Sequence, residues 1–184
     1  VLATNNYFDY ENSLIFGGRD GEYYLSISEY SPKFGSYIEY IKGERFIIPY
    51  LIGIISNITQ IEIYLLYQIL SILLSTILVL LFRNILILLK VDNISLYISL
   101  LLVIFNPYLI RYYIAVPTLV VDLAFIISLE IIVLGFMLSK NKLFYIGLIL
   151  SIMCRQNAIM ILFAFFLIKF FYKRKSIISN KDLI

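Results

Sequence analysis

Long apolar runs separated by short polar stretches fill most of the chain after residue 60. Two of them, Ile61–Phe82 and Thr118–Ser139, match the roughly 20 apolar residues that an α-helix needs to cross a bilayer. Three further apolar runs are shorter: 94–105, 143–154 and 158–171. The pattern predicts an all-α fold, a polytopic transmembrane helical bundle of about five crossings within residues 61–175.

Basic residues mark one end of these runs. Arg83 and Lys90 flank one polar gap, Lys140 and Lys142 flank another, and a basic cluster follows residue 171. Because loops rich in Lys and Arg stay in the cytoplasm, these gaps are expected on the cytoplasmic side. We therefore expect an integral protein of a prokaryotic plasma membrane, with residues 1–45 outside the cytoplasm.

The stretch before the apolar runs is acidic. Residues 1–45 hold seven of the acids against four bases, whereas the remainder holds five acids against eleven bases. Tyrosines and isoleucines alternate with those acids at spacings that predict amphipathic interfacial helices, broken near Ser31-Pro32. Residues 46–60 are expected to form an interfacial or re-entrant segment, and residues 176–184 a truncated cytoplasmic tail.

The run 143–154 is too short to cross a membrane alone. Twelve helical residues span about 18 Å, against roughly 30 Å of hydrocarbon. The turn that follows at Arg155 is therefore expected below the outer surface, where polar backbone requires protein or a wet cavity beside it. This predicts a funnel open to the outside, with the Arg155 turn as its floor.

Composition excludes several function classes. The chain is 61% hydrophobic, with no histidine and a single cysteine, Cys154. A zinc site built from His and Cys, an internal disulfide and a Ser/His/Asp triad are excluded. A phosphate-binding glycine loop is missing, so ATP-driven transport is not expected, and neither is a nucleic-acid partner. We expect the chain to be a piece of a longer protein, preceded by a further helix and inactive alone.

An acidic pair stands in the glycine-flanked segment Gly17–Tyr24. Asp20 and Glu22 could act on a substrate at the membrane surface, one carboxylate as a base and the other holding a sugar hydroxyl or, weakly, Mg²⁺ or Mn²⁺. Alternatively, Asp20 is the N-cap of a helix that starts near Gly21, with Glu22 favouring its dipole. Spacing alone leaves both interpretations open.

Charged residues also occur among the apolar runs. Arg155 at membrane depth is costly and is a functional hypothesis by default, as the ligand of a lipid phosphate. The alternative is a structural pair with Asp122 or with Glu130. Asp122 is either a second acid on the funnel wall or a partner of a helix dipole, and Arg111 and Arg45 either contact phosphate or extend to the interface.

The order of these segments resembles the GT-C class of polytopic glycosyltransferases. Asp20-Gly21-Glu22 is similar to their acidic motif in the first outer loop, and the aromatic helix that follows that motif resembles Tyr23–Ser28. Arg45–Gly53 resembles the Arg- and Pro-containing stretch that leads into the next crossing. Cys154-Arg155-Gln156 resembles an Arg-Glu turn of bacterial members, with Gln in place of Glu.

The resemblance implies an enzyme that transfers a hexosyl or pentosyl group from a polyprenyl-phosphate-linked donor to a glycan, lipid or protein acceptor in the cell envelope. It implies Asp20, Glu22 and Asp122 as catalytic acids. Carrier phosphate or substrate would be bound by Arg155, Arg111, Arg45 and Tyr23, and no residue is assigned as a metal ligand. Two alternatives remain: part of a transporter or flippase for lipid-linked glycans, and a non-enzymatic membrane subunit.

Overall fold

The computed structural model describes residues 10–33 and 45–155 together with a few single positions between 158 and 167, and for residues 10–19 it describes the backbone only. All regular structure in this described part is helical. The elements are α1 (Tyr10–Tyr30), α3 (Ile47–Thr59), α4 (Ile63–Leu88), α5 (Asn93–Phe105), α6 (Ile110–Ala115), the short 3₁₀ helix η1 (Pro117–Leu119), α7 (Val120–Met137) and α8 (Asn141–Cys154).

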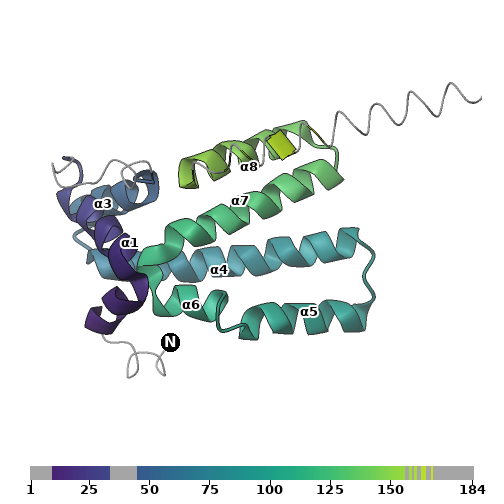
Figure 1. Cartoon of the computed structure of the whole chain (residues 1–184), viewed down its shortest axis with the longest axis horizontal. Helices are drawn as coiled ribbons and strands as arrows, with labels where there is room; N and C mark the ends of the chain where they lie inside the picture. Colours follow the sequence, from purple (N-terminus) through teal and green to yellow (C-terminus); the bar gives the residue numbers. More distant parts are fainter. Residues whose placement is uncertain are drawn as a thin grey trace, which may run out of the picture.

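The later helices form an elongated bundle (Figure 1). α4 and α7 run side by side in the same direction, while α5 returns beside α4 and α8 returns beside α7. Three helical stretches are long and apolar enough to cross a membrane: Ile63–Leu88, Asn93–Ala115 and Pro117–Met137. Large apolar side chains on α4, α5 and α8 are exposed, as expected of surfaces that face lipid. The chain is therefore an integral membrane protein with an all-helical bundle, as predicted.

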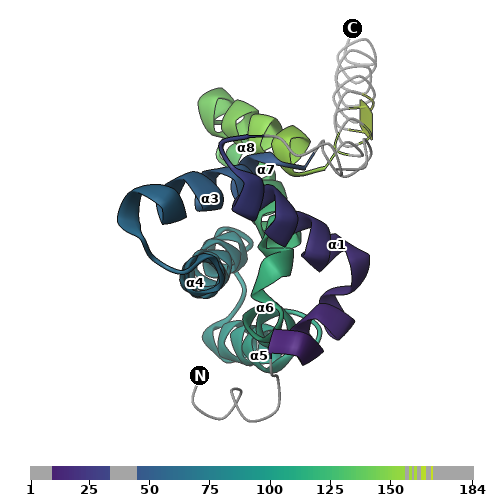
Figure 2. The same cartoon turned by 90° about the vertical axis from the view of Figure 1, so that its left-hand side faces the viewer.

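α1 and α3 form a layer across one end of this bundle. Viewed from that end, α4 is seen nearly along its axis while α1 and α3 lie across it (Figure 2). This arrangement is that of interfacial helices. The amphipathic character of the layer stays a prediction, and α1 ends at Tyr30, next to the predicted break at Ser31-Pro32. The segment predicted as interfacial or re-entrant forms α3.

A buried hydrogen-bond network joins the layer to the bundle. The hydroxyl groups of Ser28 in α1 and Tyr67 in α4 lie 2.9 Å apart. Ser28 Oγ donates to Pro49 O in α3 at 2.8 Å, and Tyr67 Oη donates to Tyr24 O at 3.0 Å. Tyr67 is fully buried. These buried polar contacts fix α1, α3 and α4 to one another. Buried hydrogen bonds that are all satisfied favour a single arrangement of the elements they join.

The helices extend the predicted apolar runs at their ends. α4 continues six residues past Phe82 and includes Arg83, whose exposed side chain can reach the interface. The run 94–105 nearly coincides with α5, but the helical path continues through α6. Thr118–Ser139 becomes η1 followed by α7, and 143–154 becomes α8. The fifth predicted crossing, 158–171, lies largely outside the described residues.

Glycines bring α7 and α8 into close contact. A Cβ atom on Gly135 would lie 2.7 Å from Phe144 Cα, and one on Gly147 would lie 2.8 Å from Ile132 N. Small residues let helix backbones approach in this way inside membranes, where van der Waals packing replaces the hydrophobic effect. The contact matters for the site because α8 ends at Cys154 and positions Arg155.

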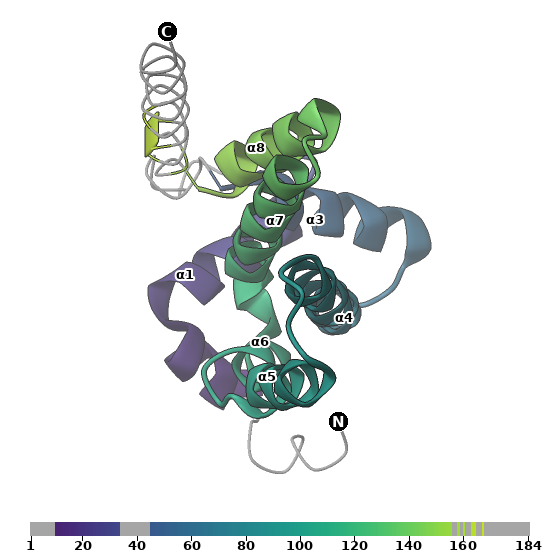
Figure 3. The same cartoon turned by 90° about the vertical axis from the view of Figure 1, so that its right-hand side faces the viewer.

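The opposite end of the bundle holds the basic turns. The α4–α5 turn includes Lys90 and the α7–α8 turn includes Lys140, and both turns lie at the end away from α1 and α3 (Figure 3). The acidic layer and the basic turns thus lie at opposite ends of the long axis, the order that the positive-inside rule predicts for a layer outside the cytoplasm.

Candidate functional site

α1 approaches the start of α7 closely at Gly21. A Cβ atom on Gly21 would lie 2.9 Å from Thr118 Oγ1 in η1, so this contact has no room for a larger residue without a shift. Asp20 immediately precedes Gly21 and is partly buried. Asp122 stands in the first turn of α7, three residues after η1 ends. The contact therefore places the Asp20 segment of the interfacial layer at the end of α7 that holds Asp122.

Tyr24 and Arg45 lie between these two acids. Arg45 Nη1 donates a hydrogen bond to Tyr24 Oη at 3.4 Å. Burial raises the pKa of the Tyr24 phenol, with Arg45 acting in the opposite sense and Asp122 and Asp20 adding to the increase. Burial alone would lower the pKa of Arg45, but the hydrogen bond to Tyr24 and attraction by Tyr24, Asp122 and Asp20 raise it overall. Arg45 thus lies in the field of both carboxylates.

Arg155 and Asp122 form an ion pair. Arg155 Nη2 donates to Asp122 Oδ1 at 2.7 Å, and Arg155 Nε donates to the same oxygen at 3.0 Å. The guanidinium carbon lies 5.5 Å from the centre of the Phe125 ring, within the range of a cation–π contact. The Asp122 side chain is 19% exposed and that of Arg155 is 35% exposed. The predicted alternative, a pair between Arg155 and Asp122, is the contact that forms.

The Asp20–Glu22 segment has a different local structure from the one predicted. α1 runs without interruption from Tyr10 to Tyr30, so Asp20 lies inside a helix, and the N-cap interpretation is wrong. Gly21 packs against Thr118 from within the helix instead of turning the chain. Residues two apart on a helix do not face each other, and Glu22 is exposed whereas Asp20 is partly buried. The geometry therefore brings Asp20 to the cluster without Glu22.

The other predicted residues, Tyr23, Arg111 and Glu130, take no part in the contacts described above. Tyr23 is partly buried on α1, and Arg111 is exposed on α6. Glu130 Oε2 is buried on α7 and has no hydrogen-bond partner within the described part of the chain. The arginine expected beside Glu130 is therefore not Arg155, which is held by Asp122 about two turns nearer the interfacial layer.

A metal centre is not formed by the residues that the structure describes, since no group of three or more acids, cysteines or histidines comes together among them. The weak Mg²⁺ or Mn²⁺ site at Asp20 and Glu22 would moreover need two side chains that point to different sides of α1. The funnel above Arg155 stays a prediction.

Sequence reasoning did not single out Tyr24 as a member of the cluster. Asp20 and Tyr24 are four residues apart, so they share one face of α1 once the segment is known to be a continuous helix. The signal was present as the spacing of acid and aromatic residue, but the expected break at Gly21 hid it. Arg45, in contrast, was predicted from its place before the proline-containing segment.

The Asp122–Arg155 pair is expected to contribute measurably to stability. Asp122→Asn and Arg155→Gln should each lower the free energy of unfolding by about 1 to 3 kcal/mol, between the values for exposed and fully buried pairs. The double variant should lose less than the sum, with a coupling of about 1 kcal/mol. Denaturant titration of the detergent-solubilised protein measures all three, with the exposed Arg111→Gln as the control. Strictly additive losses would show that the pair is not coupled.

Comparison with known proteins finds no relative of the chain. No protein-family model, no curated protein and no solved structure matches the chain.

Proposed function

We propose that the chain is the membrane-embedded part of a glycosyltransferase, which transfers a hexosyl or pentosyl group from a polyprenyl-phosphate-linked donor to an acceptor at the extracytoplasmic face. The observation that supports this most directly is the cluster of Asp20, Tyr24, Arg45, Asp122 and Arg155. It gathers two carboxylates and two guanidinium groups where the interfacial layer meets the bundle. A lipid-phosphate donor needs its head group bound at this boundary.

The cluster carries positive charges that suit the donor phosphate and carboxylates that suit the acceptor hydroxyl. Guanidinium groups bind phosphate oxygens through charge-assisted hydrogen bonds. Arg155 is a third exposed even when paired with Asp122, and Arg45 is partly buried beside Tyr24, so both can approach an incoming head group. A phosphate would compete with Asp122 for Arg155, and that competition couples donor binding to the position of Asp122.

The chemical step assigns Asp20 as the general base. The acceptor oxygen forms a bond to C1 of the sugar while the bond from C1 to the phosphate oxygen breaks, and the electron pair of that bond goes to the phosphate. The proton of the acceptor hydroxyl goes to Asp20. Arg45 and Arg155 stabilise the charge that develops on the leaving phosphate. Direct displacement inverts the configuration at C1.

The orientation of the chain supports the same assignment. The cluster lies at the end of the bundle opposite Lys90 and Lys140, and that end is extracytoplasmic by the positive-inside rule. Donors linked to a polyprenyl carrier present their sugar at a membrane surface. The acidic layer of α1 and α3 then faces the compartment in which a cell-envelope acceptor is found.

The proposed activity can be tested with the full-length protein in liposomes. Radiolabelled polyprenyl-phosphate hexoses and pentoses are supplied together with envelope lipids and glycans as acceptors. We expect one donor to be consumed, with equal amounts of polyprenyl phosphate released and sugar incorporated. A folded protein that consumes none of the donors, in the presence of the whole acceptor extract, would contradict the proposal.

One observation favours a non-enzymatic membrane subunit as the second candidate. The Arg155–Asp122 ion pair joins the end of α8 to the start of α7, and such pairs also serve to fix neighbouring helices. In that case polyprenyl phosphate in the liposomes would leave the coupling between Asp122 and Arg155 unchanged. A donor site predicts that polyprenyl phosphate weakens the coupling, because the phosphate then binds Arg155.

A further inference from the structure

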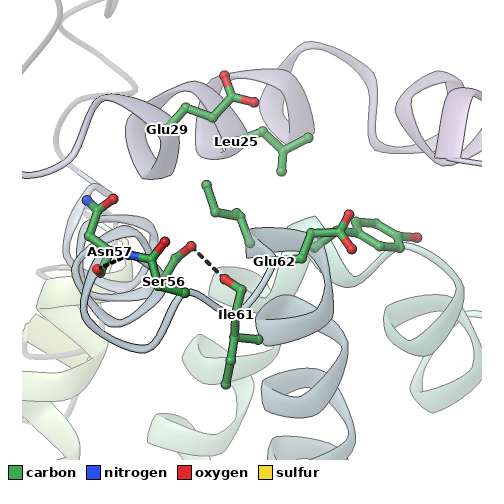
Figure 4. A pocket seen from close by; sticks show the side chains of 9 residues that line it. Leu25, Glu29, Ser56, Asn57, Ile61 and Glu62 are labelled. Carbon is green, nitrogen blue, oxygen red and sulfur yellow. Dashed lines mark hydrogen bonds between the residues drawn. The ribbon is translucent and has the colours of Figure 1, made fainter.

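A polar cavity lies between α1 and the turn that joins α3 to α4. Its volume is about 440 Å³, within the range of small-molecule sites. Leu25 and Glu29 of α1 form one side, and the α3–α4 turn forms the other with Ser56, Asn57, Gln60 and Glu62 (Figure 4). Gln60 caps the end of α3 in the left-handed conformation, with φ of 58°, and the chain turns there toward α4.

Hydrogen-bond donors in this cavity are largely engaged within the protein. Ser56 Oγ donates to Ile61 O at 2.7 Å, and Gln60 Nε2 donates to Asn57 O at 2.8 Å. Asn57 Nδ2 donates to Ser31 O at 2.7 Å. Because both amide groups turn nitrogen toward a carbonyl, their side-chain oxygens are left as acceptors.

The two carboxylates add further acceptor capacity. Glu29 and Glu62 both line the cavity and are exposed, and neither carboxylate makes a hydrogen bond or ion pair with another described residue. Among the residues that the structure describes, no basic side chain lines the cavity. An ionised carboxylate only accepts hydrogen bonds, so a well-matched ligand must be rich in donors. A phosphate, which is anionic and accepts hydrogen bonds, is disfavoured here and favoured at Arg45 and Arg155.

We propose that this cavity, the Glu29/Glu62 pocket, binds the hydroxyl groups of a neutral oligosaccharide, the acceptor of the transfer. The proposal rests on the transferase function for the use made of the ligand. A sugar presents donor hydroxyls at its edge and C–H groups on its faces. The pocket offers carboxylate and amide oxygens beside the apolar side chains of Leu25, Ile61 and Ile63. Donor phosphate and acceptor glycan would thus bind on different sides of α1, separated by charge.

The spacing along α1 defines the length of the acceptor. Glu29 follows Asp20 by nine residues, which is about 13 Å along a helix axis. A reacting hydroxyl beside Asp20 and a second contact at Glu29 therefore require a ligand longer than a single sugar ring. The inferred acceptor is an oligosaccharide chain that lies across the interfacial layer.

The pocket is tested with the full-length protein, held in lipid nanodiscs and applied to an array of neutral oligosaccharides, amino sugars and polyamines. We expect retention of neutral oligosaccharides. Glu29→Gln and Glu62→Gln should each lower retention about tenfold, since a charge-assisted hydrogen bond is lost. Asp92→Asn removes a carboxylate at the opposite end of the bundle, outside the pocket, and should leave retention unchanged.

Three outcomes would overturn this assignment. The first is that no neutral oligosaccharide is retained, and the second is retention that is equal in the variants. The third is retention of polyamines alone or only in the presence of Ca²⁺. If the array behaves as expected while no lipid-linked donor is consumed, the transferase proposal fails and the pocket stands. If donors are consumed and acceptor KM is unchanged by both glutamate variants, the pocket assignment fails alone.

Discussion

Replacing Asp20 by asparagine is expected to lower sugar transfer about 10²- to 10⁴-fold, the range in which positioned acids and bases contribute. Asparagine keeps the size and polarity of the side chain but cannot take the proton of the acceptor hydroxyl. Asp20 lies inside α1, where it caps no helix end, so the exchange should leave the fold intact. The liposome assay gives the transfer rate, and thermal unfolding of the same preparation reports on folding.

Two further variants make the Asp20 result specific. Asp92→Asn is the same chemical change at the opposite end of the bundle, where the side chain accepts a hydrogen bond from Ser95 N as the N-cap of α5. Asparagine is an equally good N-cap, so both activity and stability should be unchanged. Glu22→Gln tests whether the second acid of the motif takes part. If folded Asp20→Asn protein transfers sugar normally, the assignment of Asp20 as the base is wrong.

The helices could be predicted from the sequence because their signal is local. Each apolar run had to become a helix, since a bilayer leaves no other way to satisfy the backbone. The ends were less certain: α4 passes Arg83, because a long basic side chain on a helix can extend to the interface. The predicted helix start near Gly21 in the acidic segment was wrong. Its glycines suggested a turn, whereas Gly21 serves the contact of α1 with Thr118.

The candidate site could be predicted only in part. An arginine in apolar surroundings needs a partner, and that need pointed to Asp122 or Glu130 without choosing between them, whereas the structure shows Asp122. The contact between Tyr24 and Arg45 depends instead on how α1 crosses the bundle. The Glu29/Glu62 pocket likewise depends on the α3–α4 turn, which brings together two acids that are 33 residues apart. Such contacts arise from packing between elements. They leave no periodic pattern of residues in a single sequence from which they could be predicted.

Replacing Gly135 by leucine is expected to separate α8 from α7. The added side chain would meet the backbone of Phe144, which cannot move aside as the end of a flexible side chain could. Overpacking of this kind costs about 1 to 3 kcal/mol, occasionally more, and we expect the upper end of that range. Arg155 follows the last residue of α8, so its ion pair with Asp122 should weaken in the same variant.

The single cysteine of the chain reports on this separation directly. Cys154 is 5% exposed and belongs to the core that α7 shares with α1 and α4. Because each 1.4 kcal/mol of opening free energy is tenfold in population, Gly135→Leu should raise the rate of maleimide labelling at Cys154 tenfold or more. Val133→Leu enlarges a neighbouring, exposed side chain of α7 and should leave the rate unchanged. Equal labelling of Gly135→Leu and the parent protein would contradict the close α7–α8 contact, and with it the physical basis for holding Arg155 beside Asp122.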